Sequence, residues 1–339
     1  MTPLRFVLVG TGNIAGTYAV AAEKVDSVEI VAAVSRDAER GRAFADEHGL
    51  DGSATSLEGV ETAFDAVILA TPNGAHHAGA VAAAGLGKHV LSEKPLDITA
   101  ANMDRMIAAC REAGVRLGCA YIRRTRENNR IIKSLLAEGA FGRLYAVDMS
   151  LKVYRPQAYY DSGPWRGTKA LDGGGPFMQQ GSHDIDLLCW LFGMPTEVTA
   201  KVGTFGHTGI DVEDHGAAVC ELPGGALISI VASTVARPGF DPRMDVITER
   251  GTFSMVNDCI SFWGIEGMDD PCVAPTGDQH SATSAAVKDT SGHEAILADF
   301  AEAVRDGRDP LVPGEQARQA TDLILAVYRA AELGRTVRP

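Results

Sequence analysis

The sequence lacks an excess of positive charge and lacks any apolar run long enough to enter a bilayer. Lys and Arg number 31 against 44 Asp and Glu, giving a net charge of -13. A global basic field that would attract nucleic acid or anionic lipid is therefore absent. The apolar stretch from Ala78 to Gly87 is rich in Ala and Gly and far shorter than a membrane span. We expect no nucleic-acid partner and no membrane.

The sequence also lacks paired cysteine motifs and an export signal. Its 6 cysteines show no C-x-x-C spacing, and most lie in apolar stretches, where Cys behaves as a small hydrophobic residue. The N-terminus passes from Met1 directly into the strand-like Leu4 to Val9, without the basic flank and cleavage site of a signal peptide. These features predict reduced thiols and a cytoplasmic location.

The chain is long enough for two domains, because 339 residues exceed what one hydrophobic core usually serves. Residues 1–122 alternate short β-rich runs with Ala-rich helical stretches, which is typical of an α/β domain with a doubly wound parallel sheet. Residues 123–339 contain several long strands with few helices between them, followed by two terminal helices. This half is predicted to be an α+β domain with a large, mostly antiparallel open sheet.

A glycine turn follows the first predicted strand and opens a helix. Gly10 permits a tight turn, Gly12 lets the backbone approach a pyrophosphate, and the helix N-terminus favours a phosphate. An ordinary strand-to-helix turn has the same bare pattern, but the position at the first strand of a βαβ unit favours a dinucleotide. The predicted cofactor contacts of this turn are Gly10, Thr11, Gly12, Asn13 and Ile14.

The tip of the second predicted strand bears on the choice of cofactor. An Asp or Glu at this tip accepts the ribose hydroxyls of NAD, whereas a nearby Arg can accept the 2'-phosphate of NADP. Here Ser35 occupies the tip and Arg36 follows, so NADP(H) is favoured over NAD(H). Arg36 could equally be a solvated charge at a helix start. Asp37 could be either a helix N-cap or a ribose ligand.

Two further turns follow strands of the same predicted sheet. Thr71-Pro72-Asn73 is followed by His76 at a helix start, and Glu93-Lys94-Pro95 follows the next strand. A lysine at the mouth of a dinucleotide domain suggests chemistry on the bound cofactor. The neighbouring His76 and His77 face different sides of a helix, so no metal site is predicted. The cofactor contacts predicted here are Thr71, Pro72, Asn73, His76, Glu93 and Lys94.

Together these motifs resemble the glucose-fructose oxidoreductase/inositol dehydrogenase/MocA family. Gly173-Gly174-Gly175 and Gly181-x-His183-x-x-Asp186 extend the resemblance into the second half, and it runs over nearly the whole chain. The resemblance implies an N-terminal Rossmann domain at 1–122 and a substrate-binding and oligomerisation domain at 123–339. It also implies NAD(P)-dependent redox chemistry on sugars or cyclitols, a cis Lys94–Pro95 bond, and a homodimer or homotetramer formed through the C-terminal sheet.

The redox chemistry needs one proton moved to or from the substrate oxygen while hydride passes between two carbons. His183 is the best proton carrier, because an unperturbed histidine has a pKa of about 6.5 and a helix N-terminus favours the neutral base. Lys94 would hydrogen-bond the same oxygen and stabilise alkoxide charge. A helix-start histidine satisfied by backbone and a surface lysine are the structural alternatives. We expect the two side chains to meet in an interdomain active site.

One position departs from the common family pattern. Many members carry Asp four residues before the histidine, but this chain has Gln179, which can orient a substrate and cannot relay a proton. The loop before the triple glycine contributes Trp165, which can stack on a sugar face, and Arg166, which can bind a carboxylate, phosphate or hydroxyls. Packing of a rigid loop is the alternative for both. The predicted substrate contacts are Lys94, Tyr121, Arg155, Trp165, Arg166, Gln179 and His183.

The motifs therefore predict an NAD(P)-dependent dehydrogenase or reductase acting on a hydroxyl or carbonyl of a sugar, sugar derivative or cyclitol. The catalytic residues would be Lys94, His183 and Gln179. Two alternatives share the fold: a non-catalytic NAD(P)-binding sensor or regulator, and an NAD-dependent redox glycosidase. Both alternatives retain the dinucleotide turn, and they differ in the fate of the bound cofactor.

Overall fold

The computed structural model describes residues 2–273 and 289–339, which divide into two compact units. Among the described residues, 2–122 and 289–318 form the first unit, and 123–273 and 319–339 form the second. The sequence predicts a second domain that runs unbroken from 123 to 339, and in this respect the structure differs. Helix α8 (Ser291–Asp306) packs on α1 (Asn13–Ala22), and its Phe300 ring lies 5.9 Å from Phe6 of the first strand. Burial of that apolar face assigns α8 to the first unit.

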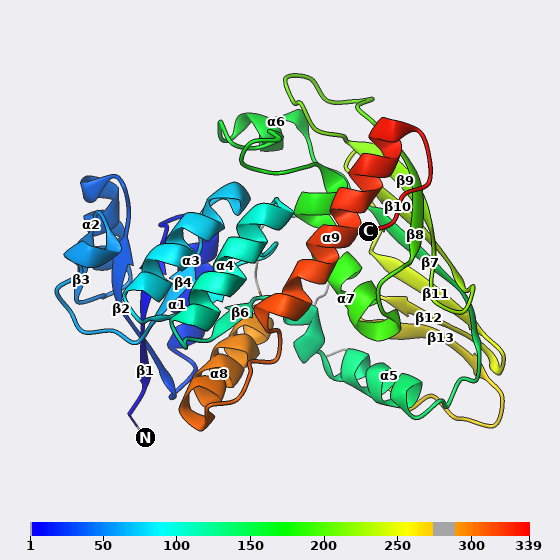
Figure 1. The fold of residues 1–339 in the computed structure, drawn as a ribbon, viewed down its shortest axis with the longest axis horizontal. Coiled ribbons are helices and arrows are strands. Elements are labelled where there is room, and N and C mark those ends of the chain that lie inside the picture. The colour runs from blue at the N-terminus through cyan, green and yellow to red at the C-terminus, as the bar shows by residue number, and fades with distance from the viewer. Residues whose placement is uncertain (1, 274–288) are drawn as a thin grey trace. The chain divides into compact units, whose positions relative to one another are not determined.

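The first unit is built on a parallel sheet of six strands in the order β3-β2-β1-β4-β5-β6 (Figure 1). The strand bounds are β1 Leu4–Val9, β2 Val28–Val34, β3 Gly52–Ala54, β4 Ala66–Leu69, β5 His89–Ser92 and β6 Leu117–Cys119. The α-helices other than α1 and α8 are α2 Ala38–Glu47, α3 His76–Gly85 and α4 Ala100–Glu112. All four residues of β4 are buried, as expected of a strand covered on both faces. The predicted doubly wound parallel sheet is confirmed.

Short 3-10 turns complete this unit and lead out of it. They are η1 Leu57–Gly59, η2 Asn73–Ala75 and η3 Ile122–Thr125. Strand β3 is absent from the sequence prediction, because its three residues are Gly, Ser and Ala and have no apolar alternation. The other strands were predictable from their β-branched and apolar runs.

The second unit contains a sheet of seven strands in the order β13-β12-β11-β7-β10-β9-β8. The strand bounds are β7 Leu144–Lys152, β8 Glu197–Gly203, β9 His215–Glu221, β10 Leu227–Ser233, β11 Arg243–Thr248, β12 Gly251–Val256 and β13 Cys259–Ile265. Within this second sheet, only the β7–β10 pair is parallel among the described strand pairs, so the predicted mostly antiparallel sheet is confirmed. The predicted turn at Pro223-Gly224-Gly225 joins the antiparallel strands β9 and β10.

The sheet of the second unit buries one face and exposes the other. In β9 buried and exposed residues alternate, which is the pattern of a strand with one solvated face. The helical elements of this unit are α5 Glu127–Ala137, α6 Gln157–Asp161, the π-helical turn η4 Pro176–Gln180, α7 Ser182–Phe192 and α9 Gly314–Leu333, which begins within the first unit. Strand β13 at the sheet edge was not predicted, although its Ile, Phe and Trp residues favour a strand, because its apolar residues do not alternate strictly with polar ones.

The predicted surface excursion from Gly267 to Ser291 falls largely on residues 274–288, outside the described residues. In the described part of the chain, no helix combines the length and apolar character needed to cross a bilayer. The six cysteines are free thiols.

Candidate active site

Three turns of the first unit lie at one edge of its sheet. Strands β1, β4 and β5 are neighbours and parallel, so their carboxyl ends bring together the glycine turn, the Thr71 turn and Lys94. The strand order reverses between β1 and β4, which is where ligands bind in open α/β sheets. Gly10 has a φ of 108°, and a Cβ there would lie 2.5 Å from the Ala70 carbonyl oxygen. Only glycine permits this close approach of the two turns.

The glycine turn meets the geometric needs of a pyrophosphate. Gly12 is the N-cap of α1, and no side chain caps the helix N-terminus there. A Cβ at Gly12 would meet nothing within 4 Å, so the space above the turn is open. Uncapped N–H groups at a helix N-terminus, with the helix dipole behind them, form an anion site. The residues present therefore fit the phosphates of a dinucleotide.

His76 ties two of these turns together. Its ring is fully buried, with Nδ1 2.9 Å from the carbonyl oxygen of Pro95 and Nε2 3.0 Å from that of Thr71. Burial lowers the pKa of His76, while the two carbonyl contacts oppose this effect. The Lys94–Pro95 bond is cis, as the family resemblance implies, and Lys94 is half-buried. Because both ring nitrogens face backbone, His76 holds the turns in place.

A cluster of buried side chains holds the backbone of Lys94 in place. Tyr18 donates its hydroxyl to Glu93 Oε1 at 2.7 Å, and His293 Nε2 lies 3.7 Å from the same oxygen. Glu93 Oε2 accepts the backbone N–H of Lys94 at 3.0 Å. Burial raises the pKa of Glu93, but His293, Lys94 and Tyr18 outweigh it, so the pKa is lowered overall. The Glu93 cluster, meaning Tyr18, Glu93 and His293, thus connects α1 and α8 to the Glu-Lys-Pro turn.

The sequence prediction missed Tyr18 and His293. Tyr18 lies in an Ala-rich helix, where it reads as a core residue, and His293 comes 200 residues after Glu93. The rings of Tyr18 and His293 meet edge to face at 5.1 Å. The local sequence shows only a tyrosine in a helix of small residues and a histidine in a helix with several acidic residues. Such isolated residues give no indication that the two side chains contact the same carboxylate.

Two arginines follow the tip of β2, and one of them, on α2, contacts the glycine turn. Ser35 is buried, Arg36 is exposed, and Arg40 Nη2 donates to the Thr11 carbonyl oxygen at 3.1 Å. Asp37 caps α2, with Oδ1 accepting the backbone N–H groups of residues 39 and 40. Of the two readings of Asp37, the N-cap is therefore the one that the structure shows. Arg40 has no counterpart in the sequence prediction, because its contact with the turn depends on the packing of α2.

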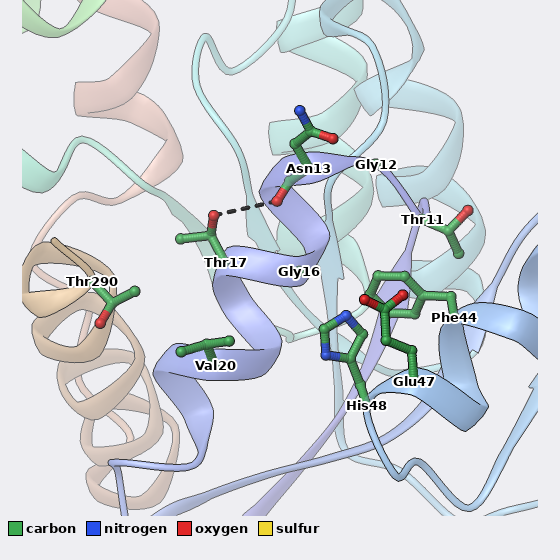
Figure 2. Close-up of a pocket in the computed structure, with 10 residues that line it drawn as sticks. All are labelled: Thr11, Gly12, Asn13, Gly16, Thr17, Val20, Phe44, Glu47, His48 and Thr290. Atoms are coloured by element: carbon green, nitrogen blue, oxygen red, sulfur yellow. Dashed lines mark hydrogen bonds between the residues drawn. The ribbon is translucent and has the colours of Figure 1, made fainter. Parts of the chain in front are cut away.

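A hollow of about 410 Å³ runs from the glycine turn along the outer side of α1 (Figure 2). In Figure 2, Phe44, Glu47 and His48 approach from α2, whereas Thr290 lies on the other side of α1. The hollow is lined by Thr11, Gly12, Asn13, Gly16, Thr17, Val20, Phe44, Glu47, His48 and Thr290. Neither Thr71 nor Lys94 lines it, so it meets the predicted cofactor site only at the glycine turn.

In the second unit, the triple glycine allows close packing beneath the turn that carries Gln179. A Cβ at Gly175 would lie 1.7 Å from the Glu213 carbonyl oxygen, and one at Gly174 would lie 2.0 Å from the Tyr328 hydroxyl. Buried Glu213 accepts the Gly175 N–H at 2.9 Å and the Tyr328 hydroxyl at 2.9 Å. Burial raises the pKa of Glu213, while these donors oppose the rise. The carboxylate therefore anchors the start of η4.

His183 lies in the first turn of α7, and Gln179 lies in the π-helical turn η4 just before it. Both side chains are partly exposed. The Gln179 N–H donates to the Gly175 carbonyl oxygen at 2.8 Å. One turn further along α7, buried Asp186 accepts two hydrogen bonds from buried Arg124, at 2.8 and 2.6 Å. Burial raises the pKa of Asp186 to about 6, against the opposing effect of Arg124. The ion pair holds α7 on the second unit.

The loop before the triple glycine forms an arginine–aromatic cluster, meaning Arg155, Tyr159, Trp165 and Arg166. The Arg166 Cζ lies 4.3 Å from the Tyr159 ring centre and 4.6 Å from that of Trp165. The Arg155 Cζ lies 5.8 Å from the Tyr159 ring centre. The structure thus brings together the predicted Arg155, Trp165 and Arg166. It adds Tyr159, which the sequence prediction missed. Tyr121, grouped with them by the sequence, is fully buried in the first unit.

These features together define a class of protein. A parallel sheet with an uncapped glycine turn at its switch point, and a lysine at the same edge, is the architecture of a nucleotide-dependent oxidoreductase. Residues 4–121 match the family model described as "Oxidoreductase family, NAD-binding Rossmann fold", and residues 129–254 match that described as "GFO/IDH/MocA C-terminal domain". The chain belongs to the GFO/IDH/MocA family of oxidoreductases.

Several characterised proteins and solved structures are similar to the chain. A 1,5-anhydro-D-fructose reductase from Ensifer adhaerens is 35% identical over 213 residues, which cover 62% of this chain and 63% of that protein. This match spans less than two thirds of the reductase. A D-xylose 1-dehydrogenase (NADP(+)) from Haloarcula marismortui is 27% identical over 99% of this chain and 93% of its own. The WlbA dehydrogenase from Bordetella pertussis, solved in complex with NADH and UDP-GlcNAcA, is 31% identical over 99% of both chains, with a TM-score of 0.88.

Proposed function

We propose that the protein is a cytoplasmic NAD(P)-dependent oxidoreductase acting on a hydroxyl or carbonyl group of a sugar, sugar derivative or cyclitol. The observation that carries the proposal is the meeting of an uncapped glycine turn and Lys94 at one edge of the first sheet. The names of the Ensifer and Haloarcula relatives, an anhydro-sugar reductase and a sugar dehydrogenase, support the substrate class. The ligands of the Bordetella structure, NADH and UDP-GlcNAcA, support the pairing of nicotinamide with a sugar derivative.

The cofactor would be held at the three turns. Backbone groups of Gly12, Asn13 and Ile14 would bind the pyrophosphate, because the N-terminus of α1 lacks a side-chain cap. Gly10 and Thr11 would shape this turn, and Thr71, Pro72, Asn73 and Glu93 would border the nicotinamide half. Once bound, the nicotinamide supplies or accepts the hydride. His76 would contribute by holding two of these turns at a constant separation.

We also propose that the protein prefers NADP(H). Arg36 and Arg40 supply two cations near the tip of β2, and Arg40 is fixed there by its bond to Thr11. Ser35 offers no carboxylate to the ribose, and the carboxylate of Asp37 is engaged as the N-cap of α2. A 2'-phosphate would therefore meet positive charge at this corner.

The chain's own residues then have distinct tasks on the substrate. Lys94, a donor-only ammonium group, would hydrogen-bond the reacting oxygen and stabilise its negative charge. His183 would move the proton to or from that oxygen, and its position in the first turn of α7 favours the neutral base. Gln179 would orient the substrate through hydrogen bonds. Because its amide does not exchange a proton with the substrate, the proton transfer depends on His183.

Steady-state kinetics of Lys94→Ala and His183→Ala would test these roles. We expect turnover to fall about a hundredfold or more in each, because each removes a group that acts on the reacting oxygen. NADPH should still bind both variants. Arg305→Ala, which removes an exposed cation near the end of α8, is the control. Wild-type turnover in both variants would refute the proposed roles of Lys94 and His183.

Two other outcomes would indicate a different function. Tight NADPH binding by the wild-type protein with no turnover of any polyol would indicate a sensor. Aglycone release without net change in nicotinamide absorbance would indicate a redox glycosidase.

We further propose that a homodimer or homotetramer forms through the open face of the second sheet. Leu227 and Ile247 both pair with Ala146 and are 51% and 37% exposed, and Val219 on β9 is 53% exposed. Exposed apolar side chains gathered on one face of a sheet are typical of a subunit interface. Light scattering of Leu227→Lys/Ile247→Lys should show a smaller assembly, whereas Val81→Lys, an exposed apolar site on α3, should not. A wild-type monomer would contradict the proposal.

A further inference from the structure

The arginine–aromatic cluster places two positive charges around one ring. Arg166 stacks on Tyr159 and Trp165, and Arg155 approaches the same Tyr159. Stacking on a ring orients a guanidinium while leaving its edge N–H groups able to donate. Within the described residues, no carboxylate forms an ion pair with Arg166. Its guanidinium is therefore aimed by aromatic contacts and is available to an anion from solution.

The electrostatics of the cluster favour an anion as its partner. Burial lowers the pKa of Arg155, Tyr159 and Tyr160 raise it, and the nearby charge of Arg166 lowers it again. The two guanidinium groups repel each other, and Arg155 is only 9% exposed, so water screens the repulsion poorly. A carboxylate or phosphate between the two cations would turn this repulsion into attraction, with charge-assisted hydrogen bonds to planar donors.

The backbone of Arg155 is held before any ligand arrives. Its N–H donates to the Thr234 carbonyl oxygen at 2.9 Å, and its own carbonyl oxygen lies 2.8 Å from His207 Nε2. His207 is in turn held by buried Asp214, whose Oδ2 lies 3.2 Å from His207 Nδ1. The Arg155 Nη1 donates to the Tyr154 carbonyl oxygen at 2.9 Å, which fixes the direction of the guanidinium. A site ordered in this way loses little conformational entropy on binding.

The loop that carries Arg166 is ordered as well. The Arg166 N–H closes a turn on the Gly163 carbonyl oxygen at 3.1 Å, and the Thr168 hydroxyl donates to the Trp165 carbonyl oxygen at 2.6 Å. These bonds hold Arg166 and Trp165 in a compact loop, so the contact between their side chains is formed within one ordered segment. The stacked guanidinium is therefore a pre-formed feature.

The cluster adjoins the turn that carries Gln179. Gln180, the next residue of η4, donates through Nε2 to the Tyr159 hydroxyl at 3.4 Å. Gln179, Gln180 and Tyr159 are all partly exposed. The cluster is therefore in direct contact with η4, the turn on which the proposed substrate residue Gln179 also lies.

We propose that the arginine–aromatic cluster binds an anionic group of the substrate, so that the protein acts on sugars carrying a carboxylate or a phosphate. Arg166 and Arg155 bind the anionic oxygens, and Tyr159 and Trp165 hold the Arg166 guanidinium. The inference rests on the proposed function, because it assigns the substrate class of the same site. The geometry of a guanidinium suits carboxylate and phosphate oxygens alike, so the test separates the two sources.

Calorimetric titration of the NADPH-bound protein with matched sugars tests the proposal. The pairs are glucose with glucuronate, glucose with glucose 6-phosphate, and UDP-GlcNAc with UDP-GlcNAcA. We expect the favoured anionic sugar to bind at least about tenfold more tightly than its neutral partner, since a hydrogen bond to a charged group contributes that much. A carboxylate ligand would favour both acids; a phosphate ligand would favour glucose 6-phosphate and leave the two UDP-sugars alike. Either pattern supports the proposal.

The variant Arg166→Gln should lose most of this preference, and Lys169→Gln should keep it. Lys169 is an exposed lysine in the same loop, so both changes remove one charge from the same segment. Circular dichroism of Arg166→Gln checks that the fold is retained, and Arg166→Lys, which keeps charge without the planar stack, should be intermediate. The proposal is overturned if no anionic sugar binds more tightly than its neutral partner, or if Arg166→Gln keeps the wild-type preference.

Binding and redox assays distinguish the role of the cluster from the oxidoreductase function. If anionic sugars bind more tightly but no sugar changes the nicotinamide absorbance when it is incubated with the protein and cofactor, the anion-binding role of the cluster is supported and the oxidoreductase function is contradicted. Oxidation of neutral sugars with no preference for anionic ones would support the function and overturn the cluster assignment.

Discussion

Replacing Tyr18 with Phe removes a single hydroxyl from the Glu93 cluster. That hydroxyl lies 2.7 Å from Glu93 Oε1, and Tyr18 is 0% exposed, so water cannot take its place. A hydrogen bond to a charged group contributes about 1.5–3 kcal/mol. We therefore expect Tyr18→Phe to lower the free energy of unfolding of the first unit by about 2 kcal/mol, with the ring packing unchanged.

The loss should depend on pH in a defined direction. The pKa of Glu93 lies below its ordinary value of 4.5, so the ionised carboxylate is stabilised in the folded state. Such a group contributes stability above pH 4.5, and the contribution disappears as the pH falls through the lowered pKa. The Tyr18 hydroxyl supplies part of that stabilisation. The difference between Tyr18→Phe and wild type should therefore be largest near neutral pH and shrink in acid below 4.5.

Hydrogen exchange read by mass spectrometry is the suitable assay. All three tryptophans, Trp165, Trp190 and Trp263, lie in the second unit, so tryptophan fluorescence reports poorly on the first. Peptides from β1, β5 and α8 should exchange faster in Tyr18→Phe. The control is Tyr145→Phe, whose ring is 47% exposed in the second unit and which should change nothing in these peptides. Unchanged protection in Tyr18→Phe, or a difference that grows in acid, would refute the reasoning.

Three further changes have defined outcomes. Gly174→Ala would place a Cβ 2.0 Å from the Tyr328 hydroxyl, so a thermal melt should show destabilisation and turnover should fall as η4 shifts. Ser35→Asp should lower kcat/KM for NADP more than tenfold by repulsion of the 2'-phosphate, a loss of about 1.4 kcal/mol or more, while NAD improves. Asp186→Ala leaves Arg124 buried without its counter-charge, so denaturant titration should show a loss of about 3–5 kcal/mol.

Matched controls make these outcomes decisive. Gly85→Ala adds a Cβ that meets nothing within 4 Å, and it should not lower the melting temperature. Asp46→Ala, an exposed acid on α2, should cost little stability compared with the change at the buried pair. A Ser35→Asp variant with unchanged cofactor preference would argue against the NADP assignment. A stable, fully active Gly174→Ala would contradict the packing account of the triple glycine.

Local features of the sequence predicted most of the fold. The alternating burial of β9 and β10 follows from side chains that point to opposite faces of a strand, and the turn at Pro223 to Gly225 follows from its glycines. The N-cap at Asp37 was one of two readings until the structure showed its bonds to the start of α2. Strand β3 was not predicted because its three residues are small. Strand β13 was not predicted because its apolar residues do not alternate strictly with polar ones, although their types favour a strand.

The amino-acid sequence by itself determined the glycine turn, the order of the motifs and the family to which they belong. Gly10, Gly12 and Lys94 are recognisable because each acts through its neighbours in the chain. Only the tertiary structure decided that α8 belongs with the first unit and that His293 supports Glu93 from 200 residues away. Likewise, the contacts of the Arg155 and Arg166 guanidinium groups with the Tyr159 ring form only when these segments pack together. Contacts of this kind leave no periodic trace in sequence, because their geometry is fixed only when distant elements bury one another.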